Sequence, residues 1–155
     1  MTASSEARWP DLAGRIEGGR HILPLRVYFE DTDFSGLVYH ASYLRWCERG
    51  RSDFLRLLGV RHADLIAPGA GAEPAAFVVR RLEIDYLRPA RIDDVLEVST
   101  ECAEISGAYL LLIQHVRRLD LSLCKLVVKV VLVGQSGKPM RLPPALRDAF
   151  VRQQA

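Results

Sequence analysis

The sequence lacks the features that mark membrane, secreted and metal-stabilised proteins. No segment has the roughly 18 uninterrupted apolar residues of a membrane span. The first residues lack the apolar core of a secretion signal. Cysteine is scarce, and its three copies, Cys47, Cys102 and Cys124, are an odd number without metal-type spacing. These absences argue against a disulfide framework and predict a cytoplasmic protein with no membrane span.

A large excess of charge of one sign is also missing. The formal net charge is only +2, and basic residues alternate with acidic ones instead of forming a long run. The sequence therefore predicts no nucleic-acid partner. Internal repeats and low-complexity segments are absent too. What is present is 155 residues, 49% hydrophobic and 26% charged, which is the composition of one globular domain with a continuous core.

One stretch organises the chain, and it reads as a strand, a tight acidic turn and a long helix. Residues 21–29 have the apolar pattern of a first strand. Apolar side chains then recur at three- and four-residue steps over residues 41–58, which predicts a helix about 27 Å long that ends at Gly59. The turn between them is marked by residues that favour local hydrogen bonds or unusual backbone angles: Asp31, Asp33, Ser35 and Gly36.

The rest of the chain reads as a sheet. Residues 61–76 contain two prolines and two glycines and predict a long loop. Four alternating segments predict strands at 77–87, 94–105, 108–118 and 122–133. The fold class is therefore α+β, an antiparallel five-stranded sheet with one long helix on a face. The last strands are apolar on both faces, so we expect a second subunit and a homo-oligomer.

The ends of the chain lie outside this pattern. Residues 1–20 have no sustained period and are predicted to be a flexible N-terminal arm. Residues 21–142 form the predicted domain. Residues 143–155 begin with two prolines and predict a short helical tail.

A family resemblance is carried by the acidic turn and by a second segment. The matching residues are Glu30, Asp31, Thr32, Asp33, Gly36, Val38, Tyr39, His40, Tyr43, Leu44, Glu48 and Arg49, together with 85–91, Asp93 and Asp94. Over roughly residues 21–140 the sequence resembles the hot-dog-fold acyl-CoA thioesterases of the 4-hydroxybenzoyl-CoA thioesterase group, in their YbgC-like, Tol-Pal-associated branch. The resemblance departs from the family at Phe34 and Ser35, where smaller residues are frequent.

The resemblance implies a fold, an activity and a site. It implies a hot-dog fold, with the sheet wrapped around the helix, assembled as homodimers or homotetramers with active sites at subunit interfaces. It implies an acyl-CoA substrate, or one on acyl carrier protein, and no cofactor. Asp33 and His40 take the catalytic positions. Gly36, Tyr39 and Arg88 are expected to contact the substrate, with Arg88 a candidate for a CoA phosphate.

The residue types suit thioester hydrolysis. Asp33 supplies an oxygen that either attacks the carbonyl carbon or activates a water. The helix that begins near His40 offers backbone N–H groups for the negative charge on the carbonyl oxygen. The His40 side chain is suited to orienting water or donating a proton to the leaving thiolate.

Simpler structural roles compete with each of these assignments. Asp33 is also suited to forming the turn or capping the helix, and His40 to starting it. Asp31 is expected to bond turn amides. Glu48 is expected to form a salt bridge with Arg45 or Arg51. A metal site of Asp31, Asp33 and His40 is a weaker alternative, and the site is predicted to hold no metal.

Two other functions compete with hydrolysis. The first is a non-catalytic hot-dog module that binds acyl carriers or partner proteins. The second is a hydratase or dehydratase of the same fold, although its usual pairing of an aspartate with a histidine in a different loop is not evident here.

Overall fold

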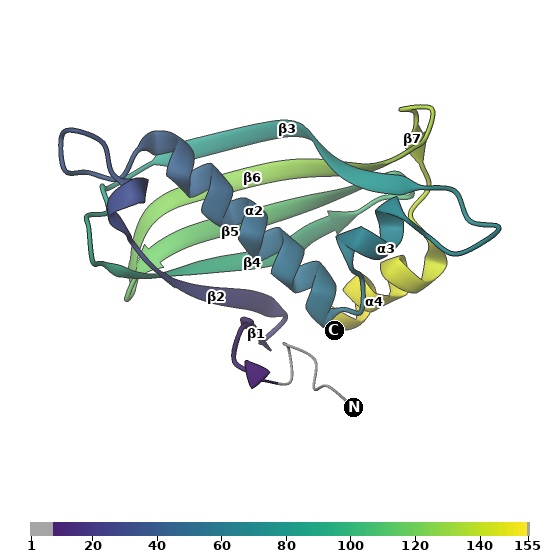
Figure 1. Cartoon of the computed structure of the whole chain (residues 1–155), viewed down its shortest axis with the longest axis horizontal. Helices are drawn as coiled ribbons and strands as arrows, with labels where there is room; N and C mark the ends of the chain where they lie inside the picture. The colour runs from purple at the N-terminus through teal and green to yellow at the C-terminus, as the bar shows by residue number, and fades with distance from the viewer. Residues whose placement is uncertain (1–7, 155) are drawn as a thin grey trace.

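The computed structural model describes residues 8–154 as one curved antiparallel sheet with a long helix across one face (Figure 1). The strand order is β1-β2-β4-β5-β6-β3, and β7 pairs with β6. The strands are β1 Arg15–Glu17, β2 Arg20–Arg26, β3 Ala75–Tyr86, β4 Val95–Ile105, β5 Tyr109–Arg118, β6 Leu121–Gly134 and β7 Pro139–Met140. The helices are α2 His40–Leu57, α3 His62–Ile66, α4 Pro144–Gln154 and the 3₁₀ turn η1 Phe29–Asp31.

The core lies between α2 and the sheet. Trp46, Cys47 and Phe54 project from α2 and are almost fully buried against strand residues such as Leu96 and Leu126. Gly50 lies where α2 approaches the sheet most closely, since an added Cβ would stand 3.0 Å from a methyl group of Val98. The helix predicted at 41–58 is confirmed to within one residue at each end.

The predicted hot-dog architecture is confirmed, with two short additions to the sheet. The four strands predicted after the helix all form, with ends that differ by one or two residues. The sheet has five long strands, as expected, and gains β1 and β7 at its margins. β1 falls within the predicted arm 1–20 and pairs with β2, while residues 1–7 lie outside the described part of the chain. The domain limits at 20 and 142 stay predictions.

Two local predictions were wrong. The first strand does not run to Phe29: β2 ends at Arg26, and the chain turns into η1, where the Asp31 carboxylate accepts a hydrogen bond from the N–H of Tyr28. The segment 61–76 is not one loop, because α3 forms at its start. α3 is only five residues long, too short to show an apolar period.

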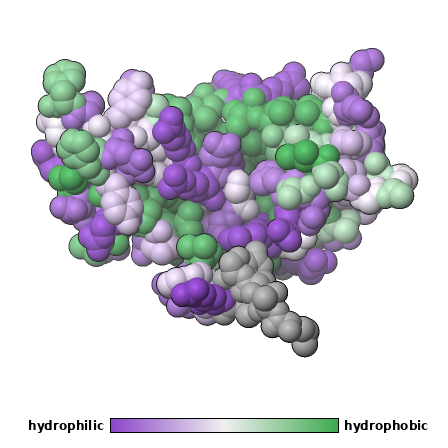
Figure 2. Space-filling model, viewed as in Figure 1, coloured by the Kyte–Doolittle hydropathy of each residue, from purple (hydrophilic) through white to green (hydrophobic). Residues whose placement is uncertain are grey.

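The surface divides by chemistry. Hydrophilic residues cover the centre of the face in Figure 2, where α2 crosses the sheet. In Figure 1, α3 and α4 gather at the end of the sheet opposite the acidic turn. Among the residues that the structure describes, no helix combines the length and apolar character needed to cross a bilayer.

Candidate active site

The acidic turn is a closed loop between β2 and α2. The N–H of Asp33 donates to the carbonyl of Leu37 at 3.0 Å, and the N–H of Gly36 donates back to the carbonyl of Asp33 at 3.1 Å. Gly36 has a φ of +81°, a backbone angle that residues with a Cβ rarely adopt. The glycine is therefore required by the backbone, and it directs the chain back toward the helix.

Asp33 lies exposed on this turn. Its Oδ1 accepts hydrogen bonds from the Ser35 hydroxyl and, at 2.8 Å, from the Ser35 N–H. The Ser35 hydroxyl, then the Ser35 N–H, and then the attraction of His40 lower the pKa of Asp33. Its Oδ2 makes no hydrogen bond to any residue in 8–154. Asp33 thus presents an ionised carboxylate with one oxygen held and the other free to take a proton.

Asp31 connects the turn to the helix. Its carbonyl accepts from the N–H of Tyr39 at 2.8 Å and from the hydroxyl of Ser42 at 3.1 Å. Its carboxylate accepts from the N–H of Tyr28, as noted above. Asp31 therefore bonds backbone amides, as expected, and fixes where α2 begins relative to Asp33.

His40 is the first residue of α2. Its carbonyl accepts a hydrogen bond from the Tyr86 hydroxyl at 2.8 Å, and its ring lies 4.4 Å from that of Tyr39. No side chain caps this helix, and within the described chain the N–H groups of His40 and Ala41 have no acceptor. These two free donors at a helix N-terminus are suited to an oxyanion.

The structure also brings the second matching segment to the turn. The N–H of Val38 donates to the carbonyl of Ala90 at 3.0 Å, and Leu37 forms a bridge with Arg91. Arg88 belongs to this segment, and its guanidinium donates a long bond of 3.4 Å to the carbonyl of Ser122. Asp33, Gly36, Tyr39 and His40 lie together between the turn and the start of α2. Arg88 lies on the segment after β3, and within the described chain its side chain bonds only Ser122.

Other chemistry is not favoured by the geometry. Burial raises the pKa of Cys47 and Cys124 to about 12 and that of Cys102 to about 11, so none of the three is an activated thiolate. Over residues 8–154, no group of three or more His, Cys, Asp or Glu side chains is placed to hold a metal ion. Each carboxylate of the turn instead has an oxygen bonded to a backbone amide.

The expected ion pair of Glu48 was wrong. Among the described residues, Glu48 has no Lys, Arg or His nitrogen within 4.0 Å. Arg51 instead turns toward the sheet and donates to the amide oxygen of the buried Gln114 at 2.9 Å. Glu48 is left with a free carboxylate on the exposed side of α2.

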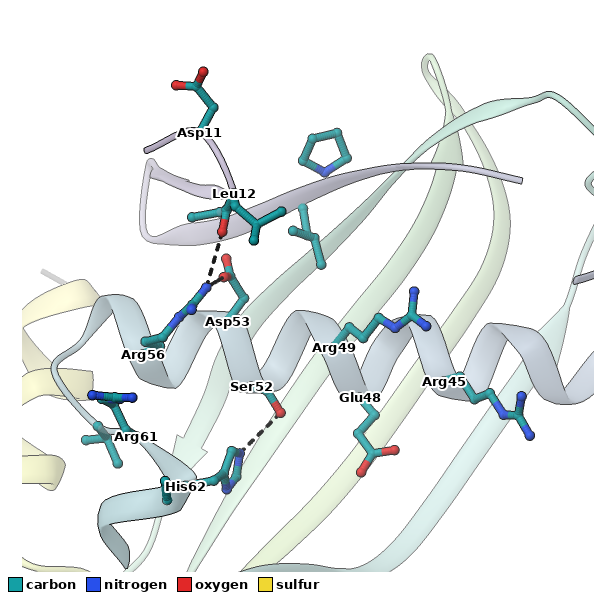
Figure 3. A pocket seen from close by; sticks show the side chains of 15 residues that line it. Asp11, Leu12, Arg45, Glu48, Arg49, Ser52, Asp53, Arg56, Arg61 and His62 are labelled. Atoms are coloured by element: carbon teal, nitrogen blue, oxygen red, sulfur yellow. Dashed lines mark hydrogen bonds and ion pairs between the residues drawn. The ribbon is translucent and has the colours of Figure 1, made fainter. Parts of the chain in front are cut away.

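Cavities flank α2 on both sides, and two of them were not predicted from the sequence. A groove of about 840 Å³ lies over its outer face, between the segment 11–13 and α3 (Figure 3). A smaller cavity of about 130 Å³ lies between α2 and the sheet on the side of β3. Its lining is largely apolar and includes Phe54, Leu55, Phe77, Leu110, Leu112 and Val130. Neither cavity contains Asp33 or His40.

A buried polar cluster was also missed. The Asp53 carboxylate accepts from the N–H of Gly14 at 2.8 Å and from Arg56 at 2.8 Å, and its Oδ2 lies 2.6 Å from the Nε2 of His21. His21 is fully buried, and its Nδ1 has no hydrogen-bond partner among residues 8–154. His21 and Asp53 are 32 positions apart, so no local pattern pointed to this pair. The groove did have a signal, because polar residues recur on α2 at Arg45, Arg49, Ser52 and Arg56.

Comparisons with known proteins agree with this geometry. A family model described as the Thioesterase-like superfamily matches residues 27–150. An acyl-CoA thioesterase YbgC of Haemophilus influenzae is 43% identical over 128 residues, which are 82% of this chain and 91% of that protein. An acyl-CoA thioester hydrolase YbgC of Escherichia coli is 40% identical over 129 residues, 82% of this chain and 92% of that protein.

The solved structures point the same way. The crystal structure of a probable thioesterase from Bartonella henselae superposes with a TM-score of 0.76 and 44% identity, over 80% of this chain and 99% of that one. The match of the family model spans the acidic turn, α2 and the four long strands β3, β4, β5 and β6, and it begins just after β2. By sequence and by fold, this chain belongs to the Thioesterase-like superfamily.

Proposed function

We propose that this protein hydrolyses acyl-CoA thioesters to a carboxylic acid and free CoA, with Asp33 as the catalytic carboxylate. The observation that carries the proposal is that Asp33 Oδ2 and the N–H groups of His40 and Ala41 all lack partners within the described chain, in one short segment of residues 33–41. Two relatives that match 82% of the chain are named acyl-CoA thioesterase and acyl-CoA thioester hydrolase, which supports the same activity.

In this scheme the thioester carbonyl oxygen lies at the N–H groups of His40 and Ala41. A water attacks the carbonyl carbon while Asp33 Oδ2 takes its proton, and the two donors stabilise the oxyanion. The C–S bond then breaks, and the leaving thiolate receives a proton. Direct attack by Asp33 is the other route: it forms a mixed anhydride that water then hydrolyses. Both routes need the ionised carboxylate that the low pKa of Asp33 supplies.

The remaining residues take supporting roles in the proposal. The His40 ring orients the water or donates to the thiolate. Gly36 and Tyr39 border the thioester, and Arg88 meets an anionic part of the CoA. The apolar cavity between α2 and the sheet is the space we assign to the acyl group.

The assembly and location of the protein are part of this proposal. β3 has β6 as its only strand neighbour in the described chain, so its outer edge is free to pair with a second copy. Val78 and Val79 on this strand are 40% and 47% exposed, which supports a homodimer or homotetramer. Cytoplasmic location stays a prediction from the sequence composition, and activity on acyl carrier protein stays a prediction from the resemblance.

The test is release of free thiol from short, long and aromatic acyl-CoAs. We expect turnover by the wild type and a loss of about 10²–10⁴ in kcat for Asp33→Asn. Asp148→Asn, which changes an exposed aspartate of α4, is the matched control and should keep full activity.

Thiol release by the wild type that Asp33→Asn leaves unchanged would remove Asp33 from the mechanism. The absence of thiol release from every substrate would favour the non-catalytic module. That alternative predicts an acyl carrier bound to the purified protein.

A further inference from the structure

The groove over α2 is an elongated channel that the acidic turn does not occupy. Its floor is the outer face of α2, and its sides are the segment 11–13 with Leu23 and Pro24 of β2, and the start of α3 (Figure 3). With a volume of about 840 Å³ it is the size of a small-molecule site. It combines apolar walls with charged side chains, which is typical of a ligand site.

Arginine side chains give the groove a positive charge. Arg45, Arg49 and Arg61 line the groove, and among the described residues their side chains make no hydrogen bond or ion pair. Arg56 is the fourth arginine, and it is occupied by Asp53 at 2.8 Å and by the carbonyl of Leu12 at 3.3 Å. Guanidinium groups without partners in a concave site are suited to bidentate binding of phosphate.

The acidic residues of the groove do not cancel this charge. Asp53 is 8% exposed and already bonded to Arg56, Gly14 and His21. Glu48 also lines the groove, but among the described residues no arginine nitrogen lies within 4.0 Å of its carboxylate, and in Figure 3 it points away from Arg49. Asp11 lies on the N-terminal segment, beyond Leu12 as seen from the helix. The three free arginines therefore face the groove without an acidic partner.

The walls of the groove are held in place. The N–H of Gly14 and the carbonyl of Leu12 are both bonded to side chains of α2, which fixes the N-terminal wall. On the other side, the Ser52 hydroxyl lies 3.2 Å from the Nε2 of His62 and connects α2 to α3. The groove is thus a built feature with both sides attached to its floor.

The groove also runs toward the candidate active site. Arg45 follows His40 by five residues, about 7.5 Å along the helix axis, and Arg56 lies about 16 Å further on. Long side chains of a helix lean toward its N-terminus, which is the end that carries His40 and the acidic turn. A ligand lying in the groove would therefore have one end near the thioester.

We propose that this groove binds the phosphorylated nucleotide of the CoA substrate. The pyrophosphate lies against Arg45 and Arg49, and the ribose phosphate lies toward Arg61, at the far end. This assignment places the CoA phosphates in the groove instead of at Arg88. The inference rests on the proposed function, because it takes the thioester to lie at Asp33. It adds a site on α2 that neither the acidic turn nor the apolar cavity provides.

The test measures binding and turnover separately. CoA and adenosine 3′,5′-bisphosphate are titrated calorimetrically into wild type and into the double variant Arg45→Gln/Arg49→Gln. We expect the affinity for both probes to fall about tenfold or more, and wild-type binding to weaken as salt is added. In turnover, the ratio of kcat/KM for an acyl-CoA to that for the matching acyl-pantetheine should fall by a similar factor.

A control variant removes the same charge elsewhere. Arg147→Gln/Arg152→Gln changes two exposed arginines of α4 and should keep the wild-type affinity and ratio. Equal CoA affinity in the wild type and the groove variant would overturn the inference. If CoA binding depends on Arg45 and Arg49 but no thioester is hydrolysed, the nucleotide site stands and the proposed function fails.

Discussion

Asp33 and Asp53 are two carboxylates with low pKa values and opposite surroundings. Asp33 is exposed, and its hydrogen bonds come from Ser35, two residues away. Asp53 is 8% exposed and bonds Gly14 and His21, which are 39 and 32 positions away. Burial alone would raise the pKa of Asp53, but its hydrogen bonds from Gly14, His21 and Arg56 together outweigh burial and lower it.

The difference separates a reactive group from an architectural one. Asp33 keeps Oδ2 free, so its charge is available to a substrate or water. Both oxygens of Asp53 are occupied, and its bonds join β2, α2 and the segment before β1. A lowered pKa alone therefore does not identify the candidate catalytic carboxylate of this protein. An oxygen that bonds none of the described residues, and a bonding partner nearby in the sequence, distinguish Asp33 better.

The largest expected effect is on stability, at Asp53. Asp53→Ala removes the only hydrogen-bond partner that the buried His21 ring has within the described chain, and it releases Gly14 and Arg56. We expect the free energy of unfolding to fall by about 3 kcal/mol, measured by urea titration at fixed protein concentration.

Asp33→Ala is the matched variant for this experiment. It loses only bonds within its own exposed turn, so its unfolding free energy should stay within about 0.5 kcal/mol of the wild type. If Asp53→Ala and Asp33→Ala lower the free energy of unfolding equally, Asp53 has no special structural role and the contrast drawn between the two carboxylates is wrong.

A smaller effect is expected at Gly14, whose N–H reaches Asp53. A Cβ at this position would collide with the carbonyl oxygen of Ile22 and stand 2.8 Å from the Nε2 of His21. We expect Gly14→Ala to cost about 1–3 kcal/mol and to speed amide hydrogen exchange in β1. Gly69→Ala, where the new Cβ meets nothing within 4 Å, is the control. Unchanged exchange in β1 would show that Asp53 does not hold this segment.

The sequence predicted those parts of the fold that depend on local patterns. β4, β5 and α2 each bury one face. The buried residues therefore alternate along β4 and β5, and they recur every three to four residues in α2. The boundaries of the strands were harder to predict. β2 was expected to reach Phe29, but the Asp31 carboxylate competes for the backbone of Tyr28 and turns the chain. β1 is three residues long and is held by its partner strand, so it has no pattern of its own.

The candidate site divides in the same way. Asp33, Gly36, Tyr39 and His40 lie within eight residues, so their composition was sufficient to identify the turn. Two features became visible only in the structure: the free Oδ2 of Asp33 and the uncapped start of α2. The pairing of His21 with Asp53 is long-range, and only folding brings the two side chains together.

The free energy of unfolding at low pH should also depend on Asp53. Its pKa is lower folded than unfolded, so its contribution is fully present above the ordinary value of 3.8 and is lost as pH falls through the folded value. The difference in unfolding free energy between wild type and Asp53→Asn should therefore be constant near neutral pH and shrink below pH 3.8. Urea titrations across this range measure it. A gap that widens on acidification would mean that the protonated form of Asp53 is the one that is stabilised.

The smallest effect is expected at the hydroxyl that holds Asp33. Ser35→Ala removes the main cause of its low pKa and leaves the bond from the residue 35 N–H, so the pKa of Asp33 should rise. Because activity needs the ionised carboxylate, the acid limb of kcat/KM should move to higher pH, with little change at neutral pH.

Ser136→Ala is the matched control. The Ser35 hydroxyl accepts a bond of 3.4 Å from the N–H of Leu37, and the Ser136 hydroxyl accepts one of 3.4 Å from the N–H of Lys138, in a turn far along the chain from Asp33. The pH profile of Ser136→Ala should equal that of the wild type. If Ser35→Ala left the acid limb in place, the group that titrates there would not be Asp33. The exposed carboxylate would then be only a turn residue, and Asp33 and Asp53 would differ in burial and hydrogen bonding but not in reactivity.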